Sequence, residues 1–299
     1  MREIVVLTSK HCWEYNVLGH PEAPFRVKDT YEYLNKKKNE LNIEVIEINN
    51  EIDEKILLLT HTKRLVEEVK SERFYEPDTP SLPNIFFYAS ISANIVLEAL
   101  KFALKGKISF ALTRPPGHHA NSDSLGGFCY FNNIACAVNW FISTSEFEFS
   151  NTNKKVAILD IDVHHGNGTQ DIFLGDDRVL FISLHQAYIY PGSGLRSEKN
   201  CINFPLSAGT TDIEYLQVLT RAIEKIKEFN PAILGVSCGF DTFKEDPLAG
   251  LALTESCYYQ IGKKISNLNL PTFCALEGGY SKKLPILIEQ FLKGLTNEE

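Results

Sequence analysis

Short apolar runs rich in β-branched residues alternate along the chain with longer segments in which apolar residues recur every three or four positions. The first pattern is typical of buried strands and the second of amphipathic helices. The expected strands are 3–7, 43–48, 107–113, 155–161, 179–184, 232–238 and 271–276. The expected helices include 86–105, 213–229, 253–267 and 284–295. This alternation predicts βαβ units and therefore an α/β fold built on a mainly parallel sheet.

The domain organisation follows from the same pattern. No internal repeat, low-complexity stretch or linker interrupts the alternation, and the polar segment 144–154 is expected to be a surface loop before a strand. A chain of 299 residues is long enough for one large α/β domain. We therefore expect residues 1–299 to form a single domain.

Composition and charge exclude several classes of protein. Hydrophobic residues make up 44% and charged residues 23% of the chain, as in ordinary globular proteins. The formal charge of −8 argues against direct nucleic-acid binding, which usually needs a basic stripe. Seven cysteines without a CxxC pair are a poor disulfide framework. Since we expect neither a signal peptide nor an apolar run approaching a membrane span, the predicted location is the cytoplasm, away from membranes.

Four polar clusters directly follow predicted strands, and they are the main indication of a functional site. They occupy residues 114–120, 160–169, 238–250 and 277–280. In open parallel α/β sheets, ligands bind at the carboxyl ends of the strands. We therefore expect the four clusters to meet in one crevice, although they are far apart in the sequence.

The second and third clusters predict a metal site. Asp160, Asp162 and His164 stand at alternate positions as an apolar strand ends, so their side chains point the same way, and Asp241 follows another buried strand. Carboxylate and imidazole ligands suit a divalent metal, and three of them leave room for water and a substrate oxygen. The alternative, that these residues only cap the next helix, is disfavoured because charges at a buried strand end are costly unless they are paired or metal-bound.

The first and fourth clusters predict acid–base chemistry. His118 and His119 lie on a loop stiffened by two prolines, and histidine is the natural general base near neutral pH. Asp160 and Asn167 are candidates for orienting these two imidazoles. Tyr280, after a pair of glycines, is placed to donate its hydroxyl to an oxyanion beside the metal.

Taken together, these residues belong to an ordered set of motifs. The set comprises HPEAPFR from His20, RPPGHHA from Arg114, GGFCYFNN from Gly126, DIDVHHGNGT from Asp160, SLH from Ser183, YPGSG from Tyr190, GFDTFKEDPLAG from Gly239 and LEGGY from Leu276. It resembles the motifs of the histone deacetylase superfamily, which includes acetylpolyamine amidohydrolases and acetoin-utilisation proteins. The resemblance implies the arginase-deacetylase fold, a single parallel sheet of about eight strands with helices on both faces.

The resemblance also implies roles for the metal-site and acid–base residues. It makes Asp162, His164 and Asp241 the ligands of one zinc ion. It pairs His118 with Asp160 and makes His119 the general base and acid. Asn167 stands where some members carry aspartate, so the partner of His119 is expected to be less basic here.

By the same resemblance, further residues form the substrate tunnel and a second ion site. Phe128 and Tyr190 match the two aromatic tunnel walls, Leu248 a third wall residue, Gly127 the carbonyl that receives the substrate amide, and Asp78 the rim aspartate. A structural potassium ion is implied at Asp160, Asp162, His164, Ser183 and Leu184. Arg26 resembles an arginine of an internal product channel.

The function expected from these residues is zinc-dependent hydrolysis of an acetyl-amide on acetyl-lysine, an acetylpolyamine or a related amine, presented as a small molecule or a flexible peptide. Leu248 stands where polyamine-selective members can place an acidic residue, so it gives no support for polyamines. Two alternatives are a two-manganese ureohydrolase of the arginase type and a catalytically silent binding module. GFDTFKED lacks the paired aspartates of the first, and the full set of catalytic residues argues against the second. Oligomeric state is left open.

Overall fold

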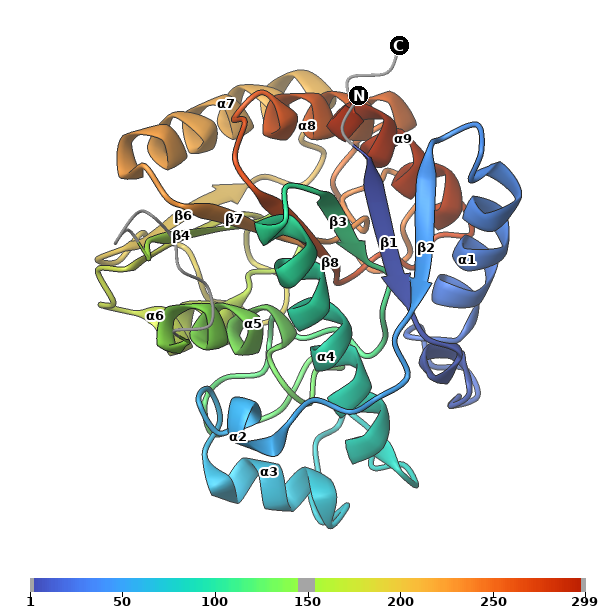
Figure 1. Ribbon diagram of the computed structural model, residues 1–299. Coiled ribbons are helices and arrows are strands. Elements are labelled where there is room, and N and C mark those ends of the chain that lie inside the picture. Colours follow the sequence, from blue (N-terminus) through green and yellow to red (C-terminus); the bar gives the residue numbers. More distant parts are fainter. Residues whose placement is uncertain (1–2, 145–153, 297–299) are drawn as a thin grey trace.

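Eight parallel strands form one sheet in the order β2-β1-β3-β8-β7-β4-β5-β6 (Figure 1). This computed structural model describes residues 3–144 and 154–296, so most of the loop expected at 144–154 lies outside the described residues. The strands are β1 (Ile4–Thr8), β2 (Ile43–Glu47), β3 (Ile108–Ala111), β4 (Val156–Asp160), β5 (Val179–Gln186), β6 (Cys201–Leu206), β7 (Ile233–Cys238) and β8 (Thr272–Leu276). The predicted α/β fold with a parallel sheet of about eight strands is confirmed.

The central strands are mainly apolar because helices cover both faces of the sheet. Every residue of β3, β4, β7 and β8 is buried, whereas only the first residue of the edge strand β2 is buried and the others are partly or fully exposed. A strand that is buried on both faces shows continuous hydrophobicity rather than alternation. The short apolar runs of the sequence therefore mark the middle of this sheet.

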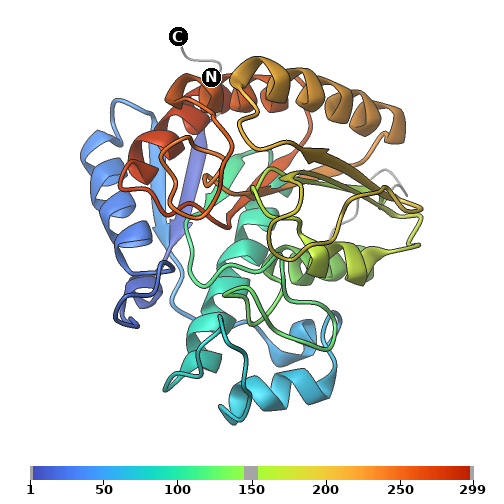
Figure 2. The ribbon, with the colours of Figure 1, turned by 180° about the vertical axis from the view of Figure 1, so that it is seen from behind.

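The helices form two layers, one on each face of the sheet (Figures 1 and 2). Helices α2 to α6 contact one another on one face, and α1, α7, α8 and α9 contact one another on the other. Their bounds are α1 (Phe25–Lys37), α2 (Glu54–Leu57), α3 (Lys63–Lys70), α4 (Ile85–Leu104), α5 (Asn133–Ser143), α6 (Asn167–Phe173), α7 (Asp212–Phe229), α8 (Glu255–Ser266) and α9 (Leu284–Thr296), with a 3-10 turn η1 (Lys10–Trp13).

Helix α4 corrects one expectation from the sequence. Its 20 residues reach a mean hydropathy of 1.4 over an 18-residue window, so by length and composition it is a candidate membrane span. The prediction that no apolar run approaches that length was therefore wrong. Within the fold, 67% of the window is buried, and α4 packs against β1, β3, β8 and α5. The apolar residues of α4 are therefore explained by its position in the core, where the sheet and α5 cover most of its surface.

Strand β6 was not predicted, and its residues explain why. It is an edge strand that pairs only with β5 among the described strands, and its positions alternate between buried and partly exposed. Pro205 lies within it, and a proline inside an apolar run argues against a strand unless that strand is at the edge of a sheet. The prediction also did not name helices α1, α2, α3, α5 and α6, whereas the strands and helices that it did name agree with the structure to within about two residues at most ends.

The sheet order brings the four polar clusters together. They follow β3, β8, β7 and β4, which are four consecutive neighbours in the middle of the sheet. Because all four strands are parallel, their carboxyl ends lie along the same edge. The convergence expected from the sequence is therefore a direct consequence of the strand order.

Candidate active site

A pocket of about 230 Å³ opens at this edge of the sheet. It is lined by Asp78, His119, Gly127, Phe128, His164, Tyr190, Leu248 and Tyr280. All eight residues were singled out from the sequence, as ligand, acid–base, wall or rim residues. The structure thus brings the predicted catalytic and substrate-binding positions to one cavity.

Three side chains, one of which is the pocket residue His164, form a group able to hold a metal ion. One potential ligand atom from each of Asp162, His164 and Asp241 lies within 4.8 Å of the others. Nδ1 of His164 is 3.1 Å from Oδ1 of Asp162 and 3.2 Å from Oδ2 of Asp241. Both carboxylates are fully buried, and Oδ2 of Asp241 accepts no hydrogen bond from the part of the chain that the structure describes. Two buried carboxylates and an imidazole that converge in this way fit a divalent cation.

Backbone groups fix the orientation of the two carboxylates. The N–H of Gly278 donates to Oδ2 of Asp162 at 2.7 Å, and the N–H of Val163 donates to Oδ1 of Asp241 at 2.9 Å. A Cβ atom on Gly239 would clash with the carboxylate of Asp162, and one on Gly278 would clash with that of Asp241. Glycine is therefore required at both positions because the backbone passes so close to the carboxylates.

His118 is paired with a carboxylate. Its Nδ1 donates to Oδ2 of Asp160 at 3.0 Å, and the ring is almost completely buried. Burial lowers the pKa of His118, but the charges of Asp160 and Asp162 outweigh that effect and raise the pKa to about 10. Without a bound cation in the group next to it, the imidazole is therefore held in its protonated form.

His119 is paired with an amide instead. Its Nδ1 donates to Oδ1 of Asn167 at 2.7 Å, which leaves Nε2 as the basic nitrogen of the ring. Burial, followed by the positive charges of His118 and His164, lowers the pKa of His119 well below its usual range. The two orienting partners proposed from the sequence, Asp160 and Asn167, are both in contact with the expected histidines. His119 is consequently the neutral member of the pair.

Tyr280 reaches the pocket from the turn after β8. Burial raises the pKa of its phenol, so the hydroxyl remains a hydrogen-bond donor at neutral pH. The N–H of Tyr280 donates to Oδ2 of Asp246 at 2.7 Å, and the guanidinium of Arg26 lies 4.8 Å from the ring centre. The tyrosine is thus held both through its backbone and through its ring.

Aromatic residues form the pocket walls above His119. The ring of Tyr190 stands edge-on to the His119 ring at 5.0 Å, and the rings of Phe128 and Tyr280 are 6.0 Å apart. Phe128 has a φ of +70°, which is unusual for a bulky residue, and its N–H donates to Oγ1 of Thr79 at 2.9 Å. Strained backbone of this kind is often found where a side chain must be aimed into a binding site.

The pocket mouth is partly apolar and partly acidic. Leu248 and Tyr190 remain 38% and 44% exposed there, and Asp78 is exposed at the rim. The N–H of Asp78 donates to Oε2 of Glu76 at 2.8 Å, and Nε2 of His20 donates to the carbonyl of Asp78 at 3.3 Å. The first contact is local to the rim segment, and the second joins this segment to His20 in another part of the chain.

The residues expected to hold potassium lie below this site. Asp160 on β4 is directly opposite Ser183 on β5, and Leu184 is the next residue of β5. Oδ1 of Asp160 accepts the N–H of Asp162 at 3.1 Å, so the turn that leads to His164 folds back over the strand end. The five residues are therefore neighbours, and potassium itself stays a prediction.

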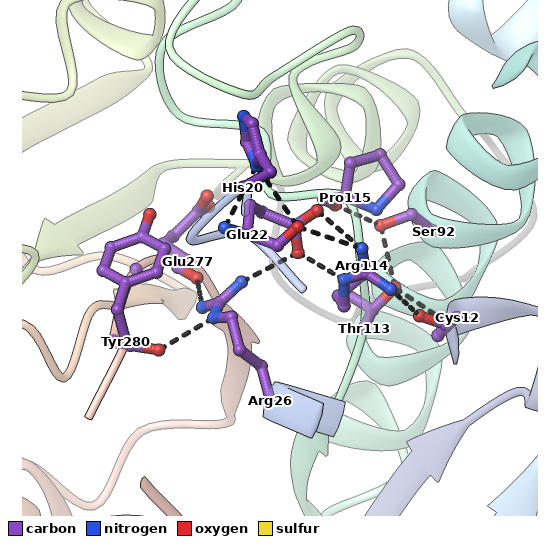
Figure 3. A network of polar contacts seen from close by, with 12 residues as sticks. Cys12, His20, Glu22, Arg26, Ser92, Thr113, Arg114, Pro115, Glu277 and Tyr280 are labelled. Carbon is purple, nitrogen blue, oxygen red and sulfur yellow. Dashed lines mark hydrogen bonds and ion pairs between the residues drawn. The ribbon is translucent and has the colours of Figure 1, made fainter. Parts of the chain in front are cut away.

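Several buried charged residues near the site had no predicted catalytic or ligand role. Glu277 accepts hydrogen bonds from the backbone of Gly117 and His118, Asp246 from that of Tyr280, and Glu22 bridges Arg26 and Arg114. Arg26 was expected to line a product channel, and the structure places it against the turn before Tyr280 (Figure 3). The sequence offered one signal for such residues, which is a charged residue directly after an apolar strand, as Glu277 is after β8.

Comparison with known proteins identifies this arrangement. The family model described as histone deacetylase domain matches residues 20–295, nearly the whole chain. The chain belongs to the histone deacetylase family. This result confirms the resemblance drawn from the motifs.

Relatives in the histone deacetylase family come from several kinds of organism. The chain is 37% identical over 318 residues to an uncharacterised protein of Methanocaldococcus jannaschii, a match that covers 98% of this chain and 89% of that protein. It is 41% identical over 202 residues to acetylpolyamine amidohydrolase 2 of Pseudomonas aeruginosa, covering 64% of this chain and 56% of the relative. Among solved structures, the HD domain of HDA15 superposes with a TM-score of 0.89 and 29% identity, over 99% of this chain and 89% of that one.

Proposed function

We propose that this protein is a zinc-dependent deacetylase that hydrolyses an acetyl-amide to acetate and a free amine. The observation that carries the proposal is that one pocket is lined by a neutral histidine, a tyrosine hydroxyl and a member of the metal-binding group. Membership of the histone deacetylase family and the similarity to a protein named acetylpolyamine amidohydrolase support amide hydrolysis as the reaction.

Asp162, His164 and Asp241 would hold the zinc ion, since their donor set matches the preference of Zn²⁺ for nitrogen and carboxylate ligands. When bound, zinc supplies Lewis acidity, which polarises a carbonyl and lowers the pKa of a water molecule. Three protein ligands leave coordination positions for these two oxygens. Oδ2 of Asp241 supports this assignment, because it is buried, lies 3.2 Å from Nδ1 of His164 and accepts no hydrogen bond among the described residues.

The side chains around the pocket have different roles in the proposed reaction. Nε2 of His119 accepts a proton from the attacking water as the new C–O bond forms, while Asn167 holds the opposite ring nitrogen. The hydroxyl of Tyr280 donates a hydrogen bond to the carbonyl oxygen as negative charge develops on it. His119 then delivers the proton to the amine nitrogen as the C–N bond breaks. His118, tied to Asp160, adjusts the charge near the site and stays outside the proton path.

Substrate binding is assigned to the remaining pocket residues. Phe128 and Tyr190 flank the acylated chain, the carbonyl of Gly127 accepts the substrate amide N–H, and Asp78 binds at the rim. A pocket of about 230 Å³ with aromatic walls suits an acetylated amine on a flexible arm, as in acetyl-lysine, an acetylpolyamine or a small acylated metabolite. Leu248 adds an apolar contact at the mouth.

Two further assignments accompany this proposal. We propose a structural potassium ion beside Asp160 and Ser183, by analogy with the family. We also propose the cytoplasm as the location. All seven cysteines are buried free thiols, which a reducing compartment preserves.

The experiment that tests the function combines metal analysis with turnover. The purified protein is loaded with zinc or manganese, and acetate release is compared on an acetyl-lysine peptide, acetylputrescine and acetylspermidine. We expect about one zinc per chain and metal-dependent acetate release, with the fastest substrate defining the class. About two manganese ions per chain with urea release from arginine would indicate a ureohydrolase, and ligand binding without turnover would indicate a binding module.

The metal assignment has its own test. Asp162→Ala, His164→Ala and Asp241→Ala should each strongly lower zinc occupancy, because the three ligands act as one site. Zinc content is measured by elemental analysis after dialysis against a weak chelator. Unchanged zinc content in all three variants would rule out this site as the metal centre.

A further inference from the structure

Buried polar contacts form a closed ring, and Figure 3 shows the part of it that runs through Glu22, Arg26 and Arg114. The ring joins the histidine loop, defined here as residues 114–119, to the tyrosine turn, defined as residues 277–280. The histidine loop carries His118 and His119 after β3, and the tyrosine turn carries Tyr280 after β8. These two segments supply the proton-transfer group and the hydroxyl donor of the reaction proposed above.

One half of the ring runs through two arginines and a glutamate. Arg114, at the start of the histidine loop, donates to Glu22 through Nε and, at 2.9 Å, through Nη2. Glu22 also accepts from Nη1 of Arg26 at 3.1 Å. Arg26 in turn donates to the carbonyl of Glu277 and, at 2.8 Å, to the carbonyl of Gly279. The backbone of the tyrosine turn is therefore clamped at two points by a side chain that is itself tied to the histidine loop.

The side chain of Glu277 closes the ring. Its Oε2 accepts the N–H of Gly117 at 2.7 Å and the N–H of His118 at 3.1 Å. Glu277 thus contacts the histidine loop through its carboxylate and Arg26 through its main-chain carbonyl. It is fully buried, as are Arg26 and Arg114. Contacts this well shielded from water are strong restraints on the relative position of the segments that they join.

The chemistry of Glu277 is unusual for a residue that only stabilises a fold. Its second oxygen, Oε1, is buried without a hydrogen-bond partner among the described residues. Burial raises the pKa of this carboxyl to about 7. A half-satisfied buried carboxyl group costs stability. Such a cost is common where a group is kept for what it does to a functional site.

We propose that Glu277 is a positioning residue, which sets the histidine loop relative to the tyrosine turn through its two hydrogen bonds to the backbone of Gly117 and His118. The inference rests on the proposed deacetylase function. His119 is the next residue after His118, so a displaced loop moves the general base away from the carbonyl that Tyr280 holds. A displacement of about 1 Å in such a geometry costs roughly 10²-fold in rate.

Three substitutions at Glu277 test whether the length of the side chain or its negative charge is needed for the positioning role. Glu277→Gln keeps the length and offers one carbonyl oxygen to both N–H groups, and its NH₂ replaces the unpartnered Oε1. Glu277→Asp keeps the charge but is one methylene too short to make both bonds. Glu277→Ala removes the contact. We expect kcat within about threefold of wild type for the glutamine variant and lower by roughly 10-fold to 100-fold for the other two, with KM changed less.

A second readout does not depend on turnover. Hydrogen exchange of the peptide covering 114–119, followed by mass spectrometry on the zinc-loaded protein, should be faster in Glu277→Asp and Glu277→Ala and unchanged in Glu277→Gln. The matched control is Glu289→Gln. Glu289 is a buried carboxylate that binds Lys37 at 2.8 Å and Lys293 at 2.9 Å, between α1 and α9. Its substitution should lower stability without changing kcat or exchange in the histidine loop.

The outcomes separate the two proposals. If the aspartate variant is active and the glutamine variant is not, charge rather than reach is what matters and the positioning role is wrong. Equal kcat and equal exchange in all three variants and wild type would also overturn it. If Glu277→Ala does not fold, the comparison of Glu277→Asp with Glu277→Gln still tests the positioning role. A wild-type protein without turnover refutes the deacetylase function, while the exchange data still test the link between Glu277 and the histidine loop.

Discussion

Two adjacent histidines acquire opposite pKa shifts from the groups that surround them. Nδ1 of His118 meets the carboxylate of Asp160, and Nδ1 of His119 meets the amide oxygen of Asn167. A carboxylate stabilises the imidazolium form, whereas an amide only fixes the tautomer. The charges of Asp160 and Asp162 outweigh burial and raise the pKa of His118, whereas burial, followed by the charges of His118 and His164, lowers the pKa of His119. At the scale of single residues, this asymmetry supports the role of general base that we propose for His119.

Replacing the two histidines should therefore have unequal effects. His119→Ala should lower kcat by roughly 10²-fold to 10⁴-fold, since no other group in the described site is placed to accept and return the proton. His118→Ala should be milder, because this residue acts through local charge. The measurement is kcat for both variants with zinc saturating, so that metal loss does not imitate a catalytic defect. A nearly active His119→Ala beside an inactive His118→Ala would reverse the roles.

The hydroxyl of Tyr280 can be tested by removing a single atom. Tyr280→Phe should lower kcat by roughly 10²-fold or more, the usual loss for one oxyanion donor, with a smaller change in KM. The ring contacts with Arg26 and Phe128 remain, so zinc content and the unfolding midpoint should match wild type. Turnover equal to that of wild type would mean that the hydroxyl is structural.

At the scale of elements, His61 fixes the segment that follows the histidine loop. Its Nδ1 donates to the carbonyl of Asn121 at 3.0 Å, and its Nε2 accepts the N–H of Asn132 at 2.9 Å. Asn132 is the N-cap residue of α5 and donates from its side chain to the carbonyl of Ala120 at 2.9 Å. A neutral, buried imidazole thus connects the turn before α3 to the start of α5.

This connection predicts a pH-dependent contribution to stability. Burial lowers the pKa of His61 from about 6.5 to about 4. The unfolded state therefore binds a proton more readily than the folded state between these pH values. The contribution is fully present above pH 6.5 and is lost as pH falls towards 4, by about 3 kcal/mol in total. Denaturant unfolding from pH 7.5 to pH 4 measures it.

The control for this prediction is His61→Gln, whose side chain stays uncharged throughout that range. The free energy of unfolding of wild type minus that of the variant should fall as the pH is lowered, because only wild type takes up the extra proton on unfolding. Other titrating groups cancel in the difference. A difference that does not change with pH would contradict the assignment of a neutral, buried His61.

At the scale of the whole molecule, the metal group joins strands that are distant in the sequence. Asp162 and His164 follow β4, Asp241 follows β7, and Gly278, whose N–H holds Asp162, follows β8. An unfolded chain does not hold these groups together. A metal ion should therefore bind the folded state far better than the unfolded state and stabilise the fold as a whole.

Metal removal should accordingly lower the unfolding temperature. With free zinc a thousandfold above Kd, the stabilisation is about 4 kcal/mol, which corresponds to a shift of several degrees Celsius for a chain of this size. Calorimetry with and without a chelator measures the shift, and added zinc should restore it. Asp241→Ala should show almost no response to the chelator, and an equal response in both proteins would place the stabilising metal elsewhere.

The sequence by itself determined the local features of this protein. Short apolar runs rich in β-branched residues located seven of the eight strands, because a strand that is buried on one or both faces is apolar at most of its covered positions. Alternation at the end of β4 indicated that Asp160, Asp162 and His164 point the same way, because side chains in an extended chain alternate sides. The ordered motifs identified the family. Each strand, each alternating pattern and each single motif lies within a few consecutive residues, where the direction of the side chains follows directly from their spacing.

The tertiary structure alone decided which of these segments are neighbours. Strand β6 exists because its edge position tolerates Pro205, and α4 is a core helix because the sheet and α5 cover it. The ring of Glu22, Arg26 and Glu277 joins residues more than 250 positions apart. Contacts between distant residues leave no periodic trace in the sequence, because their partners are brought together only when strands that are far apart in the chain pair in one sheet.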